Sequence, residues 1–430
     1  MQIITGPEQL PADIDVCIYG AGGAGAYLLS RFEALGQGGR VRRFADTYKS
    51  GRFHGLPVVA LDELLQSFDP AREALVIAST YENDIARLLE QGGIDAFVSY
   101  KNVDRYILCR LACEALPEGE RLTILDVGAR YATRDPFWLP IPRGRLRVYG
   151  FEPDAEECDR VNAEAKALGL DYTCFPIALW SSAQTLNLNI CPALPGSASL
   201  YPFDYALLNR WKVAHSTDEY VMGREMAEVR SVPLKTETLD HWREANAVAQ
   251  VDFIRMNIEG AELEALRGGE GLLPQVLGLL AEVSTVDDGR PLFADMDVFA
   301  RSKGFHFFDF FNLNHVGRGR SPLTVAKMPR VSHRAGQCTQ AYPLYLRDPV
   351  DAQARGGDVS GWDRTRILKL AALAELHFQV EYAFELLAWG ADLLEARGGA
   401  AGAADAAGLR ALADKALALY RDKYDEFFCR

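Results

Sequence analysis

Short apolar runs alternate with amphipathic segments along the first hundred residues of the chain. The apolar runs IDVCIY, VRRFAD, ALVIAST and DAFVSY are separated by helical patterns that start near Gly23, at LDELLQSF and at NDIARLLEQ. Strands that alternate with helices in this way build a parallel sheet. The pattern therefore predicts a Rossmann-like α/β domain over residues 1–105.

A second alternating series follows a helical connector over residues 106–119. Its predicted strands are TILDVG, RVYGFEP, YTCFPIALW, VDFIRMN, LGLLAEVS and GFHFFDFF, which indicate a second Rossmann-like domain over residues 120–346. In the segment VDFIRMNIEGAE, a strand suited to the inside of a sheet ends directly in polar residues. Ligands bind at the carboxyl ends of strands in open α/β sheets, so this segment indicates a site.

The periodicity becomes helical after residue 346. Two helical stretches, TRILKLAALAELHFQVEYAFELLAWGADLLEA and AGLRALADKALALYRDKYDEFF, are separated by the small-residue segment RGGAAGAADA, which we expect to be a loop. The fold class is thus α/β, with two successive Rossmann-like domains and a small α-helical C-terminal domain over residues 347–430. We expect these last helices to serve packing or association into a homo-oligomer.

Composition narrows the range of partners. The net charge of −13, from 46 Lys and Arg against 59 Asp and Glu, disfavours nucleic acid and anionic lipid surfaces. We expect a cytoplasmic protein, because no stretch has the length of a membrane span and the N-terminal residues lack a basic segment followed by an apolar one. The eight cysteines show neither C-x-x-C pairs nor zinc-ligand spacing, which predicts reduced thiols and no metal site.

The first motif that carries chemistry is IYGAGGAGAYLL. Gly20, Gly22 and Gly25 form G-x-G-x-x-G between a predicted strand and a predicted helix, where glycines allow close approach of the backbone to phosphate. Asp46 ends the next predicted strand, 21 residues after Gly25, and is placed to accept a hydrogen bond from a ribose. The motif predicts a site for a nucleotide or nucleotide-sugar; a tight strand-to-helix turn without a ligand is the alternative.

Asp46 is followed by the strand Gly55-Leu56-Pro57-Val58 within FADTYKSGRFHGLPVVALDELL. This part of the chain resembles the nucleotide-sugar-binding Rossmann domain at the N-terminus of bacterial sugar acetyltransferases. The resemblance covers about the first hundred residues and implies a nucleotide-sugar ligand. An NAD-dependent oxidoreductase built on this domain is less favoured, because the second half supplies another cofactor-type domain in place of a hydride-acceptor domain.

The second motif comprises LTILDVGARYATRDP and GFEPD. Asp126 and Gly128 close one apolar strand, and Glu152 ends the next, 24 residues after Gly128. An acid at the second strand tip is suited to hold the hydroxyls of a ribose. The loop lacks G-x-G-x-x-G, which favours a cofactor without a pyrophosphate, such as S-adenosylmethionine.

These motifs belong to a longer set of blocks in the order ILDVGA, FEPD, IALW, GSASL, PLKTETLD, VDFIRMNIEGAE, LAEVS and GFHFFDF. Over about residues 120–345 the set resembles the FkbM-type S-adenosylmethionine-dependent methyltransferases, which implies a class I methyltransferase-type sheet and methyl transfer to a hydroxyl. The resemblance also implies cofactor contacts from Asp126, Gly128, Ala129 and Glu152, and from Ala178 and Leu179 at the tip of the third strand near the adenine.

The chain departs from the family pattern at two places. Arg130, Tyr131 and Ala132 stand where the cofactor loop usually has a second glycine. Arg255 and Asn257 replace the Lys and Asp of the usual Lys-x-Asp-x-Glu-Gly-Ala-Glu stretch. Asn keeps an acceptor oxygen and adds a donor but carries no charge.

Methyl transfer requires an aligned acceptor oxygen and a group that removes its proton. Glu259, Asn257 and Glu282 at the predicted strand tips are the catalytic candidates, and His215 and His306 are further candidates for the base. For Glu259 a structural role stays open, because an acid in the first turn of a helix also stabilises the helix dipole.

The acceptor is expected to bind under the irregular segment 191–230, since long loops in compact domains are often functional. Its candidate substrate-binding residues are Tyr201, Tyr205, Trp211 and His215; a hydrophobic flap packed on the sheet is the alternative. The sequence as a whole favours an S-adenosylmethionine-dependent O-methyltransferase that acts on a sugar or glycan-related hydroxyl. A methyltransferase-like domain that binds cofactor without turnover and serves in assembly is the second reading.

Overall fold

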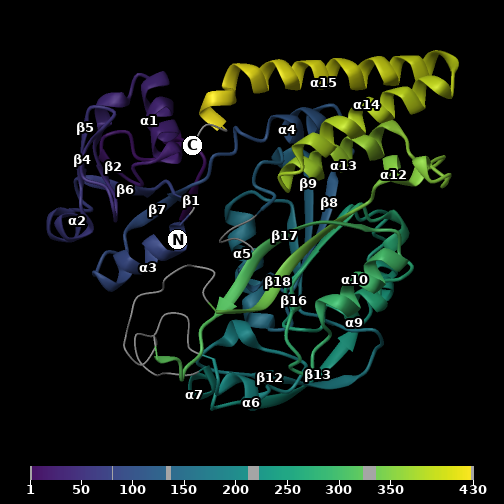
Figure 1. Ribbon diagram of the computed structural model, residues 1–430, viewed down its shortest axis with the longest axis horizontal. Helices are drawn as coiled ribbons and strands as arrows, with labels where there is room; N and C mark the ends of the chain where they lie inside the picture. Colours follow the sequence, from purple (N-terminus) through teal and green to yellow (C-terminus); the bar gives the residue numbers. More distant parts are fainter. Residues whose placement is uncertain (1, 80, 132–136, 212–221, 323–335, 428–430) are drawn as a thin grey trace. The chain divides into compact units, whose positions relative to one another are not determined.

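The computed structural model describes residues 2–79, 81–131, 137–211, 222–322 and 336–427 (Figure 1). The chain divides into two compact units. Their described residues are 2–79, 81–108, 137–140 and 411–427 in the first unit, and 109–131, 141–211, 222–322 and 336–410 in the second. Each unit has its own sheet and its own buried core, so each is described by itself.

The first unit contains a doubly wound sheet with the strand order β1-β7-β6-β2-β3-β5-β4. Val16 and Ile18 of the central strand β2 (Asp15–Tyr19) belong to the core that includes Leu28, while Cys17 belongs to the core that includes Leu89. The other elements are β1 (Gln2–Ile4), α1 (Gly23–Ala34), β3 (Val41–Ala45), β4 (Gly51–Phe53), β5 (Leu56–Val59), α2 (Leu61–Ser67), β6 (Glu73–Ile77), α3 (Glu82–Gln91) and β7 (Phe97–Tyr100). The predicted alternation of strands and helices is confirmed.

The edge of this sheet is a hairpin that the sequence pattern did not predict. β4 and β5 are antiparallel and are joined by His54 and Gly55, whose φ angles are 48° and 78°. Two consecutive residues with positive φ make the type of turn that matches the twist of paired strands. The sequence predicted a strand at Gly55–Val58 but not its partner β4, which is three residues long and too short to show a pattern of apolar positions.

The second unit contains a larger sheet with the order β10-β9-β8-β14-β15-β18-β16, and β17 pairs with β18. Strands β8 to β10, β14 and β15 are parallel, whereas β18 is antiparallel to β15 and to β17, as expected for a class I methyltransferase-type sheet. Its strands are β8 (Leu122–Val127), β9 (Leu146–Phe151), β10 (Tyr172–Phe175), β14 (Phe253–Met256), β15 (Gly278–Ala281), β16 (Val283–Ser284), β17 (His306–Val316) and β18 (Gln337–Leu346). Its helices include α5 (Ala155–Ala167), α8 (Leu239–Ala245), α9 (Glu262–Arg267) and α10 (Phe293–Ser302).

A three-stranded sheet with the order β11-β13-β12 lies beside the predicted acceptor segment in the sequence. It consists of β11 (Ala178–Leu179), β12 (Thr185–Ile190) and β13 (Arg230–Glu237), and the short helices α6 (Tyr205–Leu208) and α7 (Met222–Glu225) lie between its last two strands in the chain. The prediction that IALW forms the third strand of the main sheet is wrong. That strand, β10, ends at Phe175 because Pro176 has no N–H for the ladder, and Ala178–Leu179 pairs with β13 instead.

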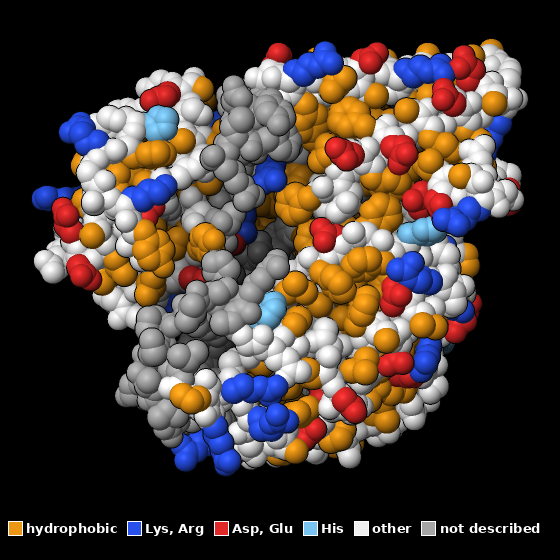
Figure 2. Space-filling view, in the orientation of Figure 1, with side chains coloured by type: hydrophobic (Ala, Val, Ile, Leu, Met, Phe, Trp, Pro, Cys, Tyr) orange, Lys and Arg blue, Asp and Glu red, His pale blue; other side chains and the backbone are white. Residues whose placement is uncertain are grey.

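Hydrophobic side chains gather at several places on the face of the second unit that Figure 2 shows, and β17 contributes aromatic residues to the surface of this unit. Phe307 contacts Phe293 of α10 with ring centroids 6.0 Å apart, and Phe308 contacts Tyr382 at 4.7 Å. Phe310 is 36% exposed. The strand therefore joins two helical layers within the unit and still presents aromatic side chains to solvent.

The remaining helices are α4 (Ile107–Glu114), α12 (Pro349–Ala354), α13 (Arg364–Leu376), α14 (Val380–Ala396) and α15 (Gly399–Phe427). The predicted loop RGGAAGAADA is wrong for most of its length, because α15 begins at Gly399 and alanine is the best helix former. No helix of the described residues is long and apolar enough to cross a membrane. The seven cysteines within these residues are reduced and form no disulfide, and Cys429 lies outside them.

A buried ion pair fixes α13 to the sheet of the second unit. Lys369 Nζ lies 3.1 Å from Asp252 Oδ2 and 3.1 Å from Glu120 Oε2, and the side chains of Lys369 and Asp252 are 2% and 0% exposed. The same Asp252 carboxylate accepts the N–H of Thr123 at 2.9 Å. The pair therefore joins α13 to the amino ends of β8 and β14.

We predict that Lys369→Met lowers the free energy of unfolding of the second unit by about 3–5 kcal/mol, because it leaves the buried Asp252 carboxylate without its cation. Lys303→Met is the matched control, since Lys303 pairs with the half-exposed Glu270 at the surface and should cost less than about 1 kcal/mol. Denaturant unfolding followed by circular dichroism measures both changes. Equal losses in the two variants would contradict the prediction.

Candidate active site

Two cavities lie at the carboxyl ends of the strands of the second unit. The cofactor cavity, as we call the first, has a volume of about 380 Å³ and is bounded by the tips of β8, β9 and β14 together with β11 to β13. The acceptor cavity has a volume of about 350 Å³ and is bounded by residues 194–211, by Met222 and Met226, and by the ends of β17 and β18. Glu259 lines both cavities.

The floor of the cofactor cavity depends on Gly128. Its φ is +89°, and a Cβ atom at this position would lie 1.9 Å from the carbonyl oxygen of Asn257. The loop after β8 and the tip of β14 can therefore approach only because residue 128 has no side chain. Gly128 and Asn257 both line the cavity, as predicted for Gly128.

Glu152 lines the cofactor cavity at the end of β9. Its Oε1 accepts the N–H of Asp154 at 3.0 Å, and Arg130 lies 3.6 Å from the same oxygen. Burial raises the pKa of the Glu152 carboxyl, and the hydrogen bond and Arg130 oppose the rise. Arg130 also pairs with Asp154 at 3.0 Å, so the residue that replaces the second glycine braces the acidic strand tip.

The structure places two predicted cofactor residues behind the cavity wall. Asp126 is 1% exposed and is held by Arg255 at 3.1 Å and by the hydroxyl of Tyr172 at 3.2 Å. Ala129 is 0% exposed. Neither lines the cavity, whereas Arg255 does, so Asp126 acts on the site through Arg255.

The apolar part of the cofactor cavity comes from the small sheet. Ala178 and Leu179 of β11 line it, together with Leu188 of β12 and Val232 and Leu234 of β13. The two predicted residues thus face the expected cavity, although they arrive there on β11 and not on the third strand of the main sheet. The hydrophobic side chains of β12 and β13 were not predicted, because their alternating pattern also fits an ordinary surface hairpin.

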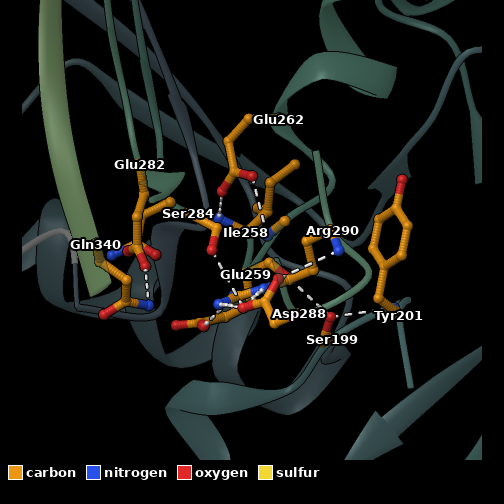
Figure 3. Close-up of polar contacts among 12 residues, drawn as sticks. Ser199, Tyr201, Ile258, Glu259, Glu262, Glu282, Ser284, Asp288, Arg290 and Gln340 are labelled. Atoms are coloured by element: carbon orange, nitrogen blue, oxygen red, sulfur yellow. Dashed lines mark hydrogen bonds and ion pairs between the residues drawn. The ribbon is translucent and has the colours of Figure 1, made fainter. Parts of the chain in front are cut away.

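The loop between β14 and α9 holds Glu259 at the junction of the two cavities (Figure 3). Glu259 has φ +54° and Gly260 has φ +105°. A left-handed conformation costs a residue other than glycine about 1–2 kcal/mol, so other contacts must hold it. The Glu262 carboxylate accepts the N–H groups of Ile258 at 2.7 Å and of Gly260 at 2.9 Å, and Ser199 Oγ donates to the Glu259 carbonyl at 2.7 Å.

The side chain of Glu259 faces a partly buried cation and a second carboxylate. Arg290 lies 3.5 Å from Glu259 Oε2, and the Arg290 guanidinium also donates to Asp288 Oδ2 at 2.7 Å and 3.0 Å. Burial and then the charge of Glu282 raise the pKa of Glu259 well above its ordinary value, and Arg290 opposes the rise. Glu259 is thus a carboxylate with raised basicity. Arg290 and Asp288 were not predicted, since a lone Asp-x-Arg has no periodic or motif signal.

Glu282 stands behind this junction. Gln340 donates to its Oε1, and the Tyr342 hydroxyl donates to its Oε2 at 2.5 Å. Asn257 Nδ2 donates in turn to the Tyr342 oxygen at 2.9 Å. Burial raises the pKa of Glu282, and the Tyr342 hydrogen bond with nearby arginines opposes this. Glu282 does not line either cavity, so it acts on Glu259 electrostatically.

Of the predicted acceptor residues, Tyr201 and Trp211 line the acceptor cavity. Tyr205 does not, because its hydroxyl donates to the Met226 carbonyl at 2.7 Å and so braces α6 against α7. His215 lies outside the described residues. His306 is far from the strand tips and lies 3.8 Å from Asp351 of α12, so its predicted role as a base is wrong.

The glycine motif of the first unit forms the expected turn. Gly20 has φ +122°, and a Cβ atom on Gly25 would lie 2.0 Å from the Gly20 carbonyl oxygen. At Gly22 an added Cβ would meet nothing within 4 Å, which leaves the start of α1 open. Asp46 accepts the N–H of Ala21 at 3.0 Å and two further N–H groups after β3, so it already stabilises the loop from within.

The sheet order, the cavity at the strand tips and the acid at the end of β9 define a class I methyltransferase-type domain. Residues 126–307 match the family described as the methyltransferase FkbM domain. Residues 126–307 thus form an FkbM methyltransferase-type domain, and the resemblance drawn from the motifs of residues 120–345 is confirmed over these residues. No curated protein matches the chain.

Two solved structures show distant similarity. Magnesium protoporphyrin IX methyltransferase (ChlM) from Synechocystis PCC 6803, with bound SAM, is 11% identical; the match covers 63% of this chain and 85% of that chain, with a TM-score of 0.27. A complex of the Haloferax volcanii Trm112 methyltransferase activator and a methyltransferase gives 12% identity, 62% and 95% coverage and a TM-score of 0.27. At these scores neither adds to the assignment, which rests on the family match and the sheet.

Within the described residues, no group of three or more His, Cys, Asp or Glu side chains is arranged to hold a metal ion. The acidic side chains at the junction are instead held by Arg290 and by hydrogen bonds from the backbone, Gln340 and Tyr342. What this arrangement can do chemically is accept a proton and orient a hydroxyl.

The buried Glu262 carboxyl should show in the pH dependence of stability. Burial, and then the charge of Glu282, raises its pKa from 4.5 to about 7. The folded protein therefore retains a proton that the unfolded chain has lost, and the contribution of Glu262 to the free energy of unfolding falls by up to about 3 kcal/mol as pH rises through this window. Glu262→Gln lacks this titration. Denaturant unfolding at about pH 5 and about pH 8 should shift the difference between the two proteins in favour of the variant at the higher pH; a difference independent of pH would contradict it.

Proposed function

We propose that the protein is an S-adenosylmethionine-dependent O-methyltransferase that modifies a hydroxyl of a sugar or glycan-related substrate. The observation that carries the proposal is the position of Glu259, which lines both the cofactor cavity and the acceptor cavity. A proton acceptor at such a junction can reach a hydroxyl that lies between the two ligands. The FkbM methyltransferase domain supports the reaction type.

The residues of the cofactor cavity fit S-adenosylmethionine. Gly128 provides close approach to the backbone, the Glu152 carboxylate can accept from ribose hydroxyls, and Ala178 and Leu179 offer an apolar surface for an adenine. The cavity has no glycine-rich phosphate loop, in keeping with a cofactor that lacks a pyrophosphate. Bound S-adenosylmethionine would supply an electrophilic methyl group.

The chain itself has to orient the acceptor and move one proton. Tyr201 and Trp211 offer aromatic faces for a sugar ring, while Asn314 and Gln340 offer polar groups on another part of the same cavity. The Glu259 carboxylate would accept the hydroxyl proton as the oxygen forms its bond to the methyl carbon. Burial makes this carboxylate a stronger base, and Arg290 keeps it oriented.

We propose that the first unit binds a nucleotide or nucleotide-sugar. The open start of α1 at Gly22 leaves backbone N–H groups accessible to phosphate. A nucleotide-sugar bound to the first unit would be in keeping with a sugar-related acceptor in the second unit. Calorimetry with UDP-sugars tests this part, and tight binding of NADH in their place would favour the oxidoreductase alternative.

Methyl transfer is tested with labelled S-adenosylmethionine and a panel of nucleotide-sugars and glycosides, followed by analysis of the labelled product. Label on an acceptor oxygen supports the proposal. Binding of S-adenosylmethionine without transfer to any acceptor would favour the non-catalytic reading, and absence of binding would overturn both.

We predict that Glu152→Gln weakens binding of S-adenosylhomocysteine at least about tenfold, because hydrogen bonds to an ionised acceptor are the stronger ones. Glu164→Gln is the control: Glu164 lies further along α5, is 42% exposed in its side chain and pairs with Arg160. Isothermal titration calorimetry compares the two. A Glu152 variant that binds as tightly as the native chain would remove this carboxylate from the cofactor site.

We also predict that Glu259→Gln lowers kcat by about 10²–10⁴ because the amide cannot accept the proton. Binding of S-adenosylhomocysteine should change by less than about threefold, which separates loss of chemistry from loss of cofactor. Steady-state kinetics and calorimetry on the same preparation give both values. A variant with the native kcat would exclude Glu259 as the base.

A further inference from the structure

The carboxylate of Glu262 is hydrogen-bonded to the backbone of the loop that carries Glu259. Glu262 is the first residue of α9, yet it reaches back before the helix and accepts the N–H groups of Ile258 and Gly260, one on each oxygen. The residue is 3% exposed and lines neither cavity. Glu262 therefore acts on the site through the loop that it holds and through its charge, and not by lining either cavity.

The loop needs these hydrogen bonds because its central residue, Glu259, has an unusual backbone conformation. Glu259 has φ +54°, a left-handed value that residues other than glycine adopt where the surroundings impose it. The two N–H groups that flank Glu259 are both bound by the same carboxylate, so the direction of the Glu259 side chain follows from the position of Glu262.

A second contact holds the loop from the acceptor side. Ser199 lines the acceptor cavity and donates its hydroxyl proton to the Glu259 carbonyl at 2.7 Å. Figure 3 shows Glu262 and Ser199 reaching the loop from different sides, with Glu259 between them. Gly260 completes the arrangement, since a Cβ atom there would lie 2.4 Å from Arg290 Cδ.

We infer that Glu262 is a positioning residue, which fixes the backbone at residues 258–260 so that the Glu259 carboxylate projects into the junction of the two cavities. The inference rests on the proposed function of Glu259. Glu262 would raise the turnover rate without binding either ligand, and Ser199 would assist from the opposite side.

Several charged or titratable groups face Glu262. They are Glu259 on the loop, Glu282 after β15, Arg290 before α10, and Tyr201, which lines the acceptor cavity. A neutral side chain at 262 changes their electrostatic environment as well as the loop. Hydrogen exchange of the loop is therefore needed beside kinetics, because it reports on backbone restraint directly.

The decisive variant is Glu262→Gln, which keeps the shape but offers one acceptor oxygen for two N–H groups. We expect kcat to fall at least about tenfold, with the acceptor KM and the S-adenosylhomocysteine Kd within about threefold of native. Amide exchange in the peptide that spans residues 256–262 should be faster in the cofactor-free protein. The control is Glu264→Gln on the same helix, where Glu264 pairs with Arg267, and all four quantities should stay native.

A native kcat in Glu262→Gln overturns the inference. Parallel losses of kcat and of S-adenosylhomocysteine binding overturn it as well, because they indicate general damage to the fold. Ser199→Ala tests the restraint on the same loop if the Glu262 variant does not fold. This variant should lower kcat about threefold without weakening cofactor binding. If the native protein transfers no methyl group, the proposed function fails, and exchange alone decides: acceleration confined to residues 256–262 supports the positioning role and unchanged exchange overturns it.

Discussion

The close approach of β8 and β14 is the constraint on which the site depends. Gly128 lies against the carbonyl of Asn257 at a distance that excludes any side chain, and the N–H of Asn257 donates to the Val127 carbonyl at 2.8 Å. Two adjacent parallel strands thereby end at the same level. The cofactor cavity opens above the first tip, and the loop with Glu259 continues from the second. A side chain at 128 would separate the tips and divide the two halves of the site.

The acidic side chains that the proposed reaction needs at this junction lower the stability of the fold. Glu262 and Glu282 are buried and Glu259 is partly buried beside them; Arg290, which pairs with Glu259, is already shared with Asp288, and Arg255 adds positive charge near Glu282. Burial raises the pKa of each of the three carboxyls, which means that each resists ionisation in the fold. Hydrogen bonds to charged groups contribute about 1.5–3 kcal/mol each and offset part of this penalty. The site is thus a strained and charged region whose cost in stability is offset by a large apolar core. Such a compromise between stability and activity is common in enzymes.

Periodicity and motif order predicted the architecture well, because both depend on local sequence. Most strands of the two sheets, the tip residues Gly128 and Glu152, and the placement of Glu259 follow from apolar runs that end in polar residues, whereas β1, β4 and β18 were not predicted. Contacts between distant segments could not be predicted. Arg290 meets Glu259 across 31 positions of the chain, and Tyr342 meets Glu282 across 60, with no spacing rule to connect them. Asp126 was placed at the ligand for the same reason: the motif identifies the strand tip but not which side chain turns inward.

The side-chain amide of Asn257 supplies the hydrogen-bond donor that its neighbour Tyr342 requires. The Tyr342 hydroxyl gives its proton to Glu282, so its oxygen can only accept from a second neighbour, and Asn257 Nδ2 supplies that donor. An Asp at 257, as in the FkbM pattern, has no proton to give and would add a fourth negative charge beside Glu259, Glu262 and Glu282. The amide therefore satisfies Tyr342 without placing a further charge beside Glu282. In this chain the departure at 257 and the network of Glu282 form one arrangement, which leaves Glu259 as the acid that faces both cavities.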